Sequence, residues 1–226
     1  MKKLIINGII ILAVALLPPQ VIQAQGTMVY VSNLAQLQAG SLAAGSDSWV
    51  GNEFSIGSNP GGYVLDSVQL AMANASGNPG GFTVLLYGTR AGGEAYYGSG
   101  GSDTVTPLIG SNNPSTAGIY TYAPPASLML SQNYFYSIVI NASTTVATGS
   151  YNWIEADGPL NLSGGWSSSH ALACSSDGLS WSNSFGSSGV YPEFAVNATA
   201  VPEPGVLGLF SVGILILCGW RKPPNS

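Results

Sequence analysis

Short runs in which hydrophobic and less hydrophobic residues alternate recur through the middle of the chain. Val68, Leu70 and Met72 fall on one side of an extended segment. The same two-residue period continues in 82–86 and 134–140, which are rich in aromatic and β-branched residues. A period of two indicates β-strands with one buried face. No stretch between the two ends of the chain has the spacing of a long amphipathic helix.

Turn residues separate these segments from others of strand-like composition. Residues 78–81 (Asn-Pro-Gly-Gly) predict a hairpin connection between the strands on either side of them. Asp177-Gly178 predicts a tight type I′ turn. Many short strands with turn punctuation favour an all-β fold, a β-sandwich. Further strands are expected at 48–56, 118–123, 127–131, 150–156, 170–176 and 190–198.

Residues 1–24 have the parts of a secretory signal peptide. Two lysines precede a mainly apolar run at 4–17, and Ala24 offers a cleavage site before Gln25. The apolar run is shorter than the roughly 17 residues that a membrane-spanning helix needs. We therefore expect a signal helix that is removed between Ala24 and Gln25. The alternative is an uncleaved membrane anchor.

The opposite end of the chain carries a second apolar segment. Residues 205–220 contain no charge and would form a helix of about 24 Å, a little short of the hydrocarbon core of a bilayer. Arg221 and Lys222 follow directly, and the positive-inside rule then keeps the tail 221–226 cytoplasmic and the domain outside. Because the signal peptide gives the same topology, a transmembrane helix is favoured over the alternative, a buried core helix.

Pro202, Glu203 and Pro204 stand just before this segment. The order Pro-Glu-Pro, short transmembrane helix and basic pair resembles the PEP-CTERM sorting signal of Gram-negative bacteria. The resemblance implies that an exosortase, a membrane protease, cuts near the motif and that the protein is released or attached at the cell surface. It also implies an association with exopolysaccharide and biofilm production. The chain then divides into a signal peptide (1–24), a secreted domain (25–200) and a sorting signal (201–226).

The middle of the chain resembles a second family. The segments NEFSIG, LDSVQLAM, GGFTVLLYG, YNWIEA and SSDGLSW occur in that order between about residues 48 and 198. Their order is similar to that of the choice-of-anchor domains, most nearly the R form. This resemblance implies a jelly-roll-like sandwich and no assigned activity.

Charge excludes several classes of partner. Between the two terminal segments the chain carries nine acids and a single base, Arg90, which gives a net charge near −8. Nucleic acids and anionic membrane surfaces are bound by clusters of Lys and Arg, so neither is an expected partner of the domain.

Few residues could hold a metal or a cofactor, and we expect none. Cys174 and Cys218 belong to different parts of the chain and cannot build a disulfide framework or a zinc site. His170 is the only histidine and is expected to be structural or exposed. Cys174 is expected to be a small packing residue rather than a nucleophile. A calcium ion held between loops by Asp47 or Asp103 stays open.

No catalytic residues are expected, and one pair of acids is the alternative. Glu155 and Asp157 are two residues apart and would share a strand face. Paired carboxylates can hydrolyse glycosides when they are held at the right separation. However, the strand runs directly into a Gly-Pro turn, where acids usually face solvent.

Aromatic residues are the strongest sign of a binding function. Trp49, Trp153, Trp166 and Trp181 all lie in the secreted part. They either fill the core or offer exposed faces on which sugar rings stack. Trp166, in the loop-like context SGGWSSS, is the candidate for glycan binding.

These patterns together predict an exported, surface-sorted protein without enzymatic activity, belonging to the cell envelope or to an exopolysaccharide or biofilm matrix. Its partners would be an exosortase-like protease and extracellular polysaccharide, with the membrane contacted through the C-terminal helix before processing. A glycan-binding module on the same anchor is the alternative, and a glycoside hydrolase using Glu155 and Asp157 is a lesser one.

Overall fold

The computed structural model of the chain describes residues 26–90, 104–168, 171–178, 181–185 and 190–202. Apart from Pro202, these residues belong to one compact unit, Gln25–Val201. They form an all-β structure, and none of the described residues lies in a helix. This part of the chain therefore contains no helix that could cross a membrane. The expected signal helix and transmembrane helix lie outside the described residues.

The strands are short and follow one another closely along the chain. Their bounds are β1 (Met28–Ser32), β2 (Leu37–Ala44), β3 (Trp49–Ser55), β4 (Tyr63–Met72), β5 (Ser76–Gly77), β6 (Phe82–Arg90), β7 (Thr104–Gly110), β8 (Gly118–Ala123), β9 (Leu128–Leu130), β10 (Tyr134–Ala142), β11 (Gly149–Asp157), β12 (Asn161–Leu162), β13 (Ala171–Ser175), β14 (Trp181–Phe185), β15 (Val190–Pro192) and β16 (Phe194–Ala200).

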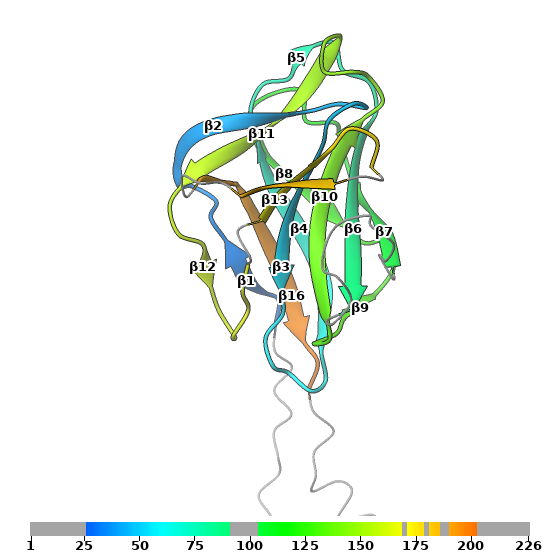
Figure 1. The fold of residues 1–226 in the computed structure, drawn as a ribbon. Helices are drawn as coiled ribbons and strands as arrows, with labels where there is room; N and C mark the ends of the chain where they lie inside the picture. Colours follow the sequence, from blue (N-terminus) through cyan, green and yellow to red (C-terminus); the bar gives the residue numbers. More distant parts are fainter. Residues whose placement is uncertain (1–25, 91–103, 169–170, 179–180, 186–189, 203–226) are drawn as a thin grey trace, which may run out of the picture. The chain divides into compact units, whose positions relative to one another are not determined.

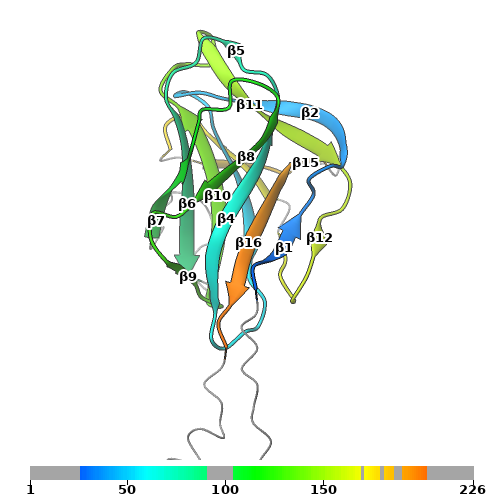
Figure 2. The same cartoon turned by 180° about the vertical axis from the view of Figure 1, so that it is seen from behind.

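All the strands join one antiparallel sheet that folds over on itself. Its hydrogen-bonded order is β12-β1-β16-β4-β8-β7-β6-β10-β3-β13-β14, with β11 attached to β2, β5, β15 and the end of β4. β7 links the two halves because it pairs with β6 and, at Ile109, with β8. Figure 1 shows β3, β10 and β6 in front, and Figure 2 shows β4, β16 and β1 from behind. Side chains of the two halves meet in a shared core, as Phe82 and Tyr122 do.

The alternating segments form strands with the buried faces that their patterns predict. Val68, Leu70 and Met72 of β4 are each 0% exposed. Val84 and Leu86 of β6 are buried in the same core. Each fully buried side chain of this size contributes about 1.5–3 kcal/mol. This part of the core therefore comes from the residues that the two-residue period singles out.

The hairpin predicted at residues 78–81 is wrong. β4 pairs with β16, β8 and β9, whereas β6 pairs with β10 and β7, so the two strands belong to different halves of the sheet. After β4 the chain runs along β11 and forms hydrogen bonds with it. Ala73 N–H donates to the carbonyl of Asn152 at 2.8 Å, and β5 pairs with Gly149 and Ser150 of β11. The glycines of 78–81 thus carry the chain from one half of the sheet to the other.

Trp166 lies in the core, which corrects the prediction that it is an exposed platform for sugars. Its side chain is 3% exposed. The ring stacks on Tyr30 with a centroid separation of 4.7 Å and on Phe54 at 5.7 Å. Tyr63 meets it edge-on at 5.0 Å. Tyr30 and Tyr63 come from one half of the sheet and Phe54 from the other, so the indole fills the space between them.

The backbone around Trp166 explains why a loop residue points inward. Ser163 N–H donates to the carbonyl of Tyr30 at 2.9 Å on β1. Ser167 and Ser55 exchange two backbone hydrogen bonds, of 2.7 and 3.0 Å, which tie the segment to β3. Gly164 has φ of +60° and its neighbour is also left-handed, a conformation that glycine adopts without strain. The segment 163–167 thus bridges β1 and β3, and the turn within it directs the indole into the core.

We expect Trp166→Ala to lower the free energy of unfolding by about 3–5 kcal/mol, because it removes a large buried ring and leaves a cavity. Urea denaturation followed by far-UV circular dichroism measures this. Trp181→Ala, which truncates a half-buried ring, is the matched control and should cost less. A loss below about 1 kcal/mol for Trp166→Ala would contradict its role in the core.

Candidate functional site

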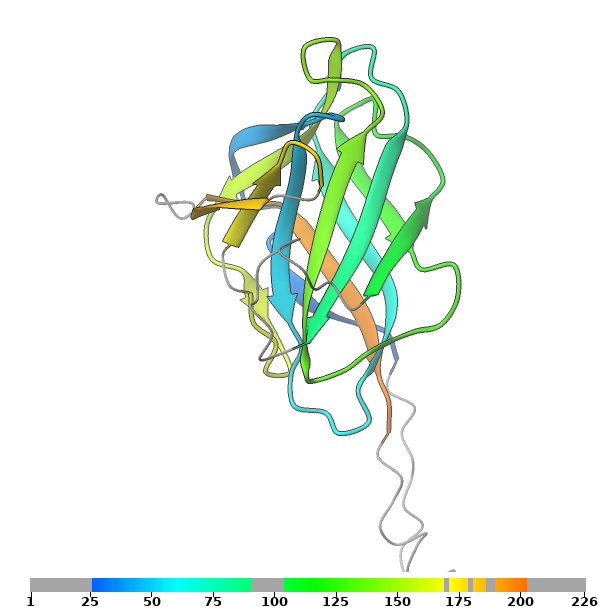
Figure 3. The ribbon, with the colours of Figure 1, turned by 45° about the vertical axis from the view of Figure 1, so that its right-hand side comes forward.

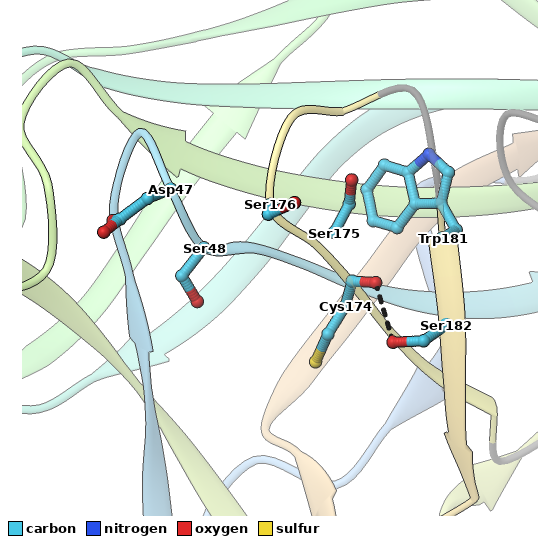
Figure 4. A pocket seen from close by; sticks show the side chains of 7 residues that line it. All are labelled: Asp47, Ser48, Cys174, Ser175, Ser176, Trp181 and Ser182. Carbon is cyan, nitrogen blue, oxygen red and sulfur yellow. Dashed lines mark hydrogen bonds between the residues drawn. The ribbon is translucent and has the colours of Figure 1, made fainter.

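An open pocket lies where the β2–β3 connection meets the hairpin of β13 and β14. Its volume is about 450 Å³. Figure 3 shows this hairpin beside β3, and Figure 4 shows the pocket from close by. Side chains of the β2–β3 connection lie on one side of it and those of β14 on the other. The lining residues are Asp47, Ser48, Cys174, Ser175, Ser176, Trp181 and Ser182.

The β2–β3 connection is a tight turn that fixes Asp47 and Ser48. Gly45 and Ser48 exchange backbone hydrogen bonds of 2.9 and 3.3 Å across it. Asp47 is exposed, and its Oδ1 accepts a hydrogen bond of 2.8 Å from the backbone N–H of Val146. Ser48 Oγ donates to the carbonyl of Ala43 at 2.9 Å. Both side chains are therefore held by backbone partners at the rim of the pocket.

The connection between β13 and β14 does not form the predicted type I′ turn. Ser175 pairs with Trp181, so the loop is longer than two residues, and Gly178 has φ of +72° while Asp177 does not have a positive φ. The turn is organised by Ser175 Oγ, which accepts a hydrogen bond of 2.8 Å from Gly178 N–H and donates one of 3.1 Å to Asp177 Oδ1. A Cβ on Gly178 would come within 2.9 Å of the Trp49 ring. Glycine is therefore needed for two reasons, backbone conformation and the close approach of the indole.

Trp181 is held by two aromatic neighbours on the face of the sheet that is turned away from the core. Its ring meets Trp49 at 6.5 Å and Tyr87 at 6.3 Å, both in T-shaped geometry. Leu85 and the fully buried Val139 pack in the same cluster. Trp181 itself is half-buried. Edge-to-face contacts of this kind stabilise a ring in one orientation, so the indole reaches the pocket as a rigid wall.

Cys174 behaves as the packing residue that its context predicts. It is half-buried and packs against the main core. Burial, together with the nearby Glu155 carboxylate, raises the pKa of its thiol. A thiol with a raised pKa stays protonated at neutral pH and is a poor nucleophile. Ser182 Oγ donates to the carbonyl of Cys174 at 3.2 Å, and this hydrogen bond adds to the pairing of β13 with β14 beside the pocket.

Glu155 and Asp157 lie on β11 and are not among the residues that line this pocket. Asp157 is exposed. Glu155 is partly buried, and a Cβ on Gly40 of β2 would come within 3.1 Å of its Oε2. The register of β11 against β2 shifts directly after Glu155. The carboxylate of Glu155 therefore lies against β2.

The remaining sequence-predicted residues lie at or beyond the edge of the described part. Pro202 is exposed. Among the described residues no three His, Cys, Asp or Glu side chains gather closely enough to hold a metal ion. The residues outside this part are Ala24, Gln25, Asp103, His170, Glu203, Pro204, Arg221 and Lys222.

Most of the pocket could not be recognised from the sequence. Trp181 belongs to the aromatic set that the sequence singles out, and Asp47 was considered only as a calcium ligand. Ser176 and Ser182 carry no signal of their own, because serine is abundant throughout the chain. Only the pairing of β13 with β3 brings these residues next to Asp47 and Ser48.

Comparison of the chain with protein-family models and with curated proteins gives no match.

Two partly or fully buried carboxyl groups make the fold sensitive to pH. Glu193, between β15 and β16, is 5% exposed, and burial raises the pKa of its carboxyl although a hydrogen bond from the Ala35 N–H partly opposes this. Burial also raises the pKa of Glu155. A carboxyl whose pKa is raised on folding stabilises the fold in its protonated form. That stabilisation is complete below the ordinary value of 4.5 and is lost as pH rises through the higher pKa of the folded state.

We therefore expect the protein to be more stable at pH 5.5 than at pH 7.5. Glu193→Gln removes the buried charge and should raise the melting temperature at pH 7.5 by about 2–4 °C, with a smaller change at pH 5.5. Asp157→Asn, which removes one exposed charge, is the control for net charge. Differential scanning calorimetry at the two pH values measures the effect, and an equal shift in both variants would contradict a local cause at Glu193.

Proposed function

We propose that the chain is an exported, surface-sorted protein without enzymatic activity, belonging to the cell envelope or to an extracellular polysaccharide matrix. The order of its parts supports the proposal: a signal peptide, a β domain, Pro202-Glu203-Pro204, an apolar segment and a basic pair. An exosortase-like membrane protease would process the sorting signal. The protein would then stay at the surface or enter the matrix.

The arrangement of the two ends of the domain is the observation that carries this proposal. β1 and β16 are antiparallel neighbours, and Met28 pairs with Ala198. The chain therefore enters and leaves the domain at the same end, so a cleaved N-terminus leaves the domain joined to the sorting signal through β16 alone. This arrangement is compatible with display of the domain from a single C-terminal point.

The C-terminal exit of the domain is fixed by the β3–β4 connection. Val201 N–H donates to the carbonyl of Gly62 at 3.0 Å. Asn59 Nδ2 donates to the carbonyl of Val201 at 3.1 Å and to that of Gly62 at 2.6 Å. Pro202 follows directly and is exposed, so the described part of the domain reaches the first residue of the proposed sorting motif.

The finer classification of the domain is part of the proposal. We assign it to the jelly-roll-like sandwiches of the choice-of-anchor type. The folded-over antiparallel sheet, with a core shared by its two halves, supports this assignment.

The surface of β4 and β16 that faces away from the core suits a hydrated matrix. Asn197 Nδ2 donates to Ser67 Oγ at 3.1 Å, and Thr199 Oγ1 donates to Asp66 Oδ2 at 2.8 Å. These cross-strand pairs are hydroxyls and amides with a single acid among them. Such groups exchange hydrogen bonds with water and with sugar hydroxyls equally well.

A glycan-binding module on the same anchor is the second candidate. The pocket at Trp181 favours it because an ordered indole lies among serine hydroxyls there. The hydrolase alternative has less support, since Glu155 and Asp157 are not among the residues lining that pocket.

The sorting signal is tested in the native host. Glu203→Ala, or Pro202→Ala with Pro204→Ala, should leave export intact and block processing, because the protease would lose its recognition element. The protein should then accumulate in the membrane fraction at a larger mass, with Gln25 as its first residue. Intact mass spectrometry and membrane fractionation measure these outcomes.

Pro124→Ala with Pro125→Ala is the matched control for loss of two prolines and should be processed normally. A wild-type protein that keeps residues 205–226 at steady state would contradict the proposal and replace it with a single-pass membrane protein.

A further inference from the structure

The lining of the pocket at Trp181 restricts the chemistry of a ligand. Its described lining combines one indole with four serines, one cysteine and one carboxylate, and none of these lining residues is a lysine or an arginine. A ligand that covers the pocket removes the serine hydroxyls from water, so it has to return hydrogen bonds to them. A purely apolar ligand cannot do this. The volume of about 450 Å³ lies in the range of small-molecule sites.

The charge of the domain further restricts which ligands the pocket can bind. The secreted domain has nine acids and a single base, and Asp47 stands at the rim of the pocket. Arg90, the only base, is not among the lining residues. Phosphates, sulfates and uronic acids would meet negative charge without a compensating cation. An anionic ligand is therefore disfavoured, and a ligand that is rich in hydroxyls and has one apolar face matches the serines and the indole of the lining.

We propose that this pocket binds a neutral hexose unit of a polysaccharide, with one face of the sugar ring on Trp181. The C–H groups on that face carry small positive charges, and the face of an indole is negative. The ring hydroxyls would donate hydrogen bonds to the hydroxyl oxygens of Ser48 and Ser182. Each of these serines already donates to a backbone carbonyl, which leaves its oxygen able to accept from the sugar. The inference rests on the second candidate function and is independent of the sorting signal.

The site is organised before any ligand arrives. Trp49 and Tyr87 hold Trp181 in T-shaped contacts, and the Ser175 hydroxyl holds the turn that precedes it. Side chains fixed in this way lose little conformational entropy on binding, which favours affinity for a weakly interacting ligand such as a sugar.

The position of the pocket also suits a polymer outside the cell. The pocket lies at the start of β3. Asp47 and Ser48 directly precede this strand, and Ser175 pairs with Trp49, the first residue of β3. Asn59, which holds the C-terminal exit, lies four residues after Ser55, the last residue of β3. The pocket and the exit therefore lie at opposite ends of a seven-residue strand, roughly 20 Å apart. A domain attached through its C-terminus would present the pocket on its remote side.

The test uses the exported protein, purified from the expressing cells. Cellohexaose, laminarihexaose and mannohexaose are the neutral probes, and hexagalacturonate is the anionic probe of equal length. Isothermal titration calorimetry and tryptophan fluorescence measure binding. We expect saturable binding of at least one neutral probe, and binding of hexagalacturonate that is at least tenfold weaker.

Three variants distinguish an effect on the binding site from an effect on folding. Trp181→Ala should weaken binding at least tenfold. Ser176→Tyr places a bulky side chain at an exposed position of the lining and should block the pocket without disturbing the core. Tyr120→Ala on β8 is the matched control and should bind as the wild type does. Far-UV circular dichroism and the melting temperature check that each variant is folded.

If Trp181→Ala does not fold, the binding measured for the Ser176→Tyr variant alone tests the proposal. Three results would overturn the proposal: no saturable binding of any neutral probe, unchanged binding by a folded Ser176→Tyr variant, or tighter binding of hexagalacturonate than of the neutral probes. None of these results bears on processing at Pro202-Glu203-Pro204, so the two proposals fail separately.

Discussion

The ring of Trp166 lies between β1 and β3, two strands that do not pair with each other directly. The hydrogen-bonded order ends with β12 beside β1 in one half and with β13 and β14 beside β3 in the other. The segment 163–167 crosses between β1 and β3 and inserts an indole between Tyr30, Tyr63 and Phe54. The core needs this contact because an open sheet would otherwise expose the apolar faces of both halves at that side.

The pocket depends on the same closure, although it lies on the other end of β3. With the two halves held together, β3 is buried along nearly its whole length and serves as a fixed frame. β13 pairs with β3 and carries Trp181 on the adjoining strand. The position of the indole relative to Asp47 is therefore set by two sheet registers. A site built on strand pairing keeps its geometry better than one built on loops alone.

Sequence patterns predicted the strands that bury one clear face and failed where the pattern was weak. β4 and β6 alternate between more and less buried positions over much of their length and were predicted. β10 was also predicted, although it is buried at every position from Tyr136 to Ala142. β2 was missed because its residues are small and largely exposed, and β7 because Pro107 interrupts a short run. The strands that pair with β4 could not be predicted from the sequence, because strand pairing is decided by contacts between residues that are distant in sequence. Trp166 was misplaced because composition marks 163–168 as a loop but cannot tell which way a side chain turns.

The way β16 is embedded determines how the domain responds to tension. A load carried by a C-terminal attachment enters the fold at Val201 and pulls along β16. That strand is paired with β4 at seven positions and with β1 at four, all antiparallel. Pulling along the strand loads these hydrogen bonds in shear, so many of them must break together. Peeling the strand from an edge would break them one after another. The position of β16 between two neighbours would therefore make the proposed C-terminal attachment mechanically resistant.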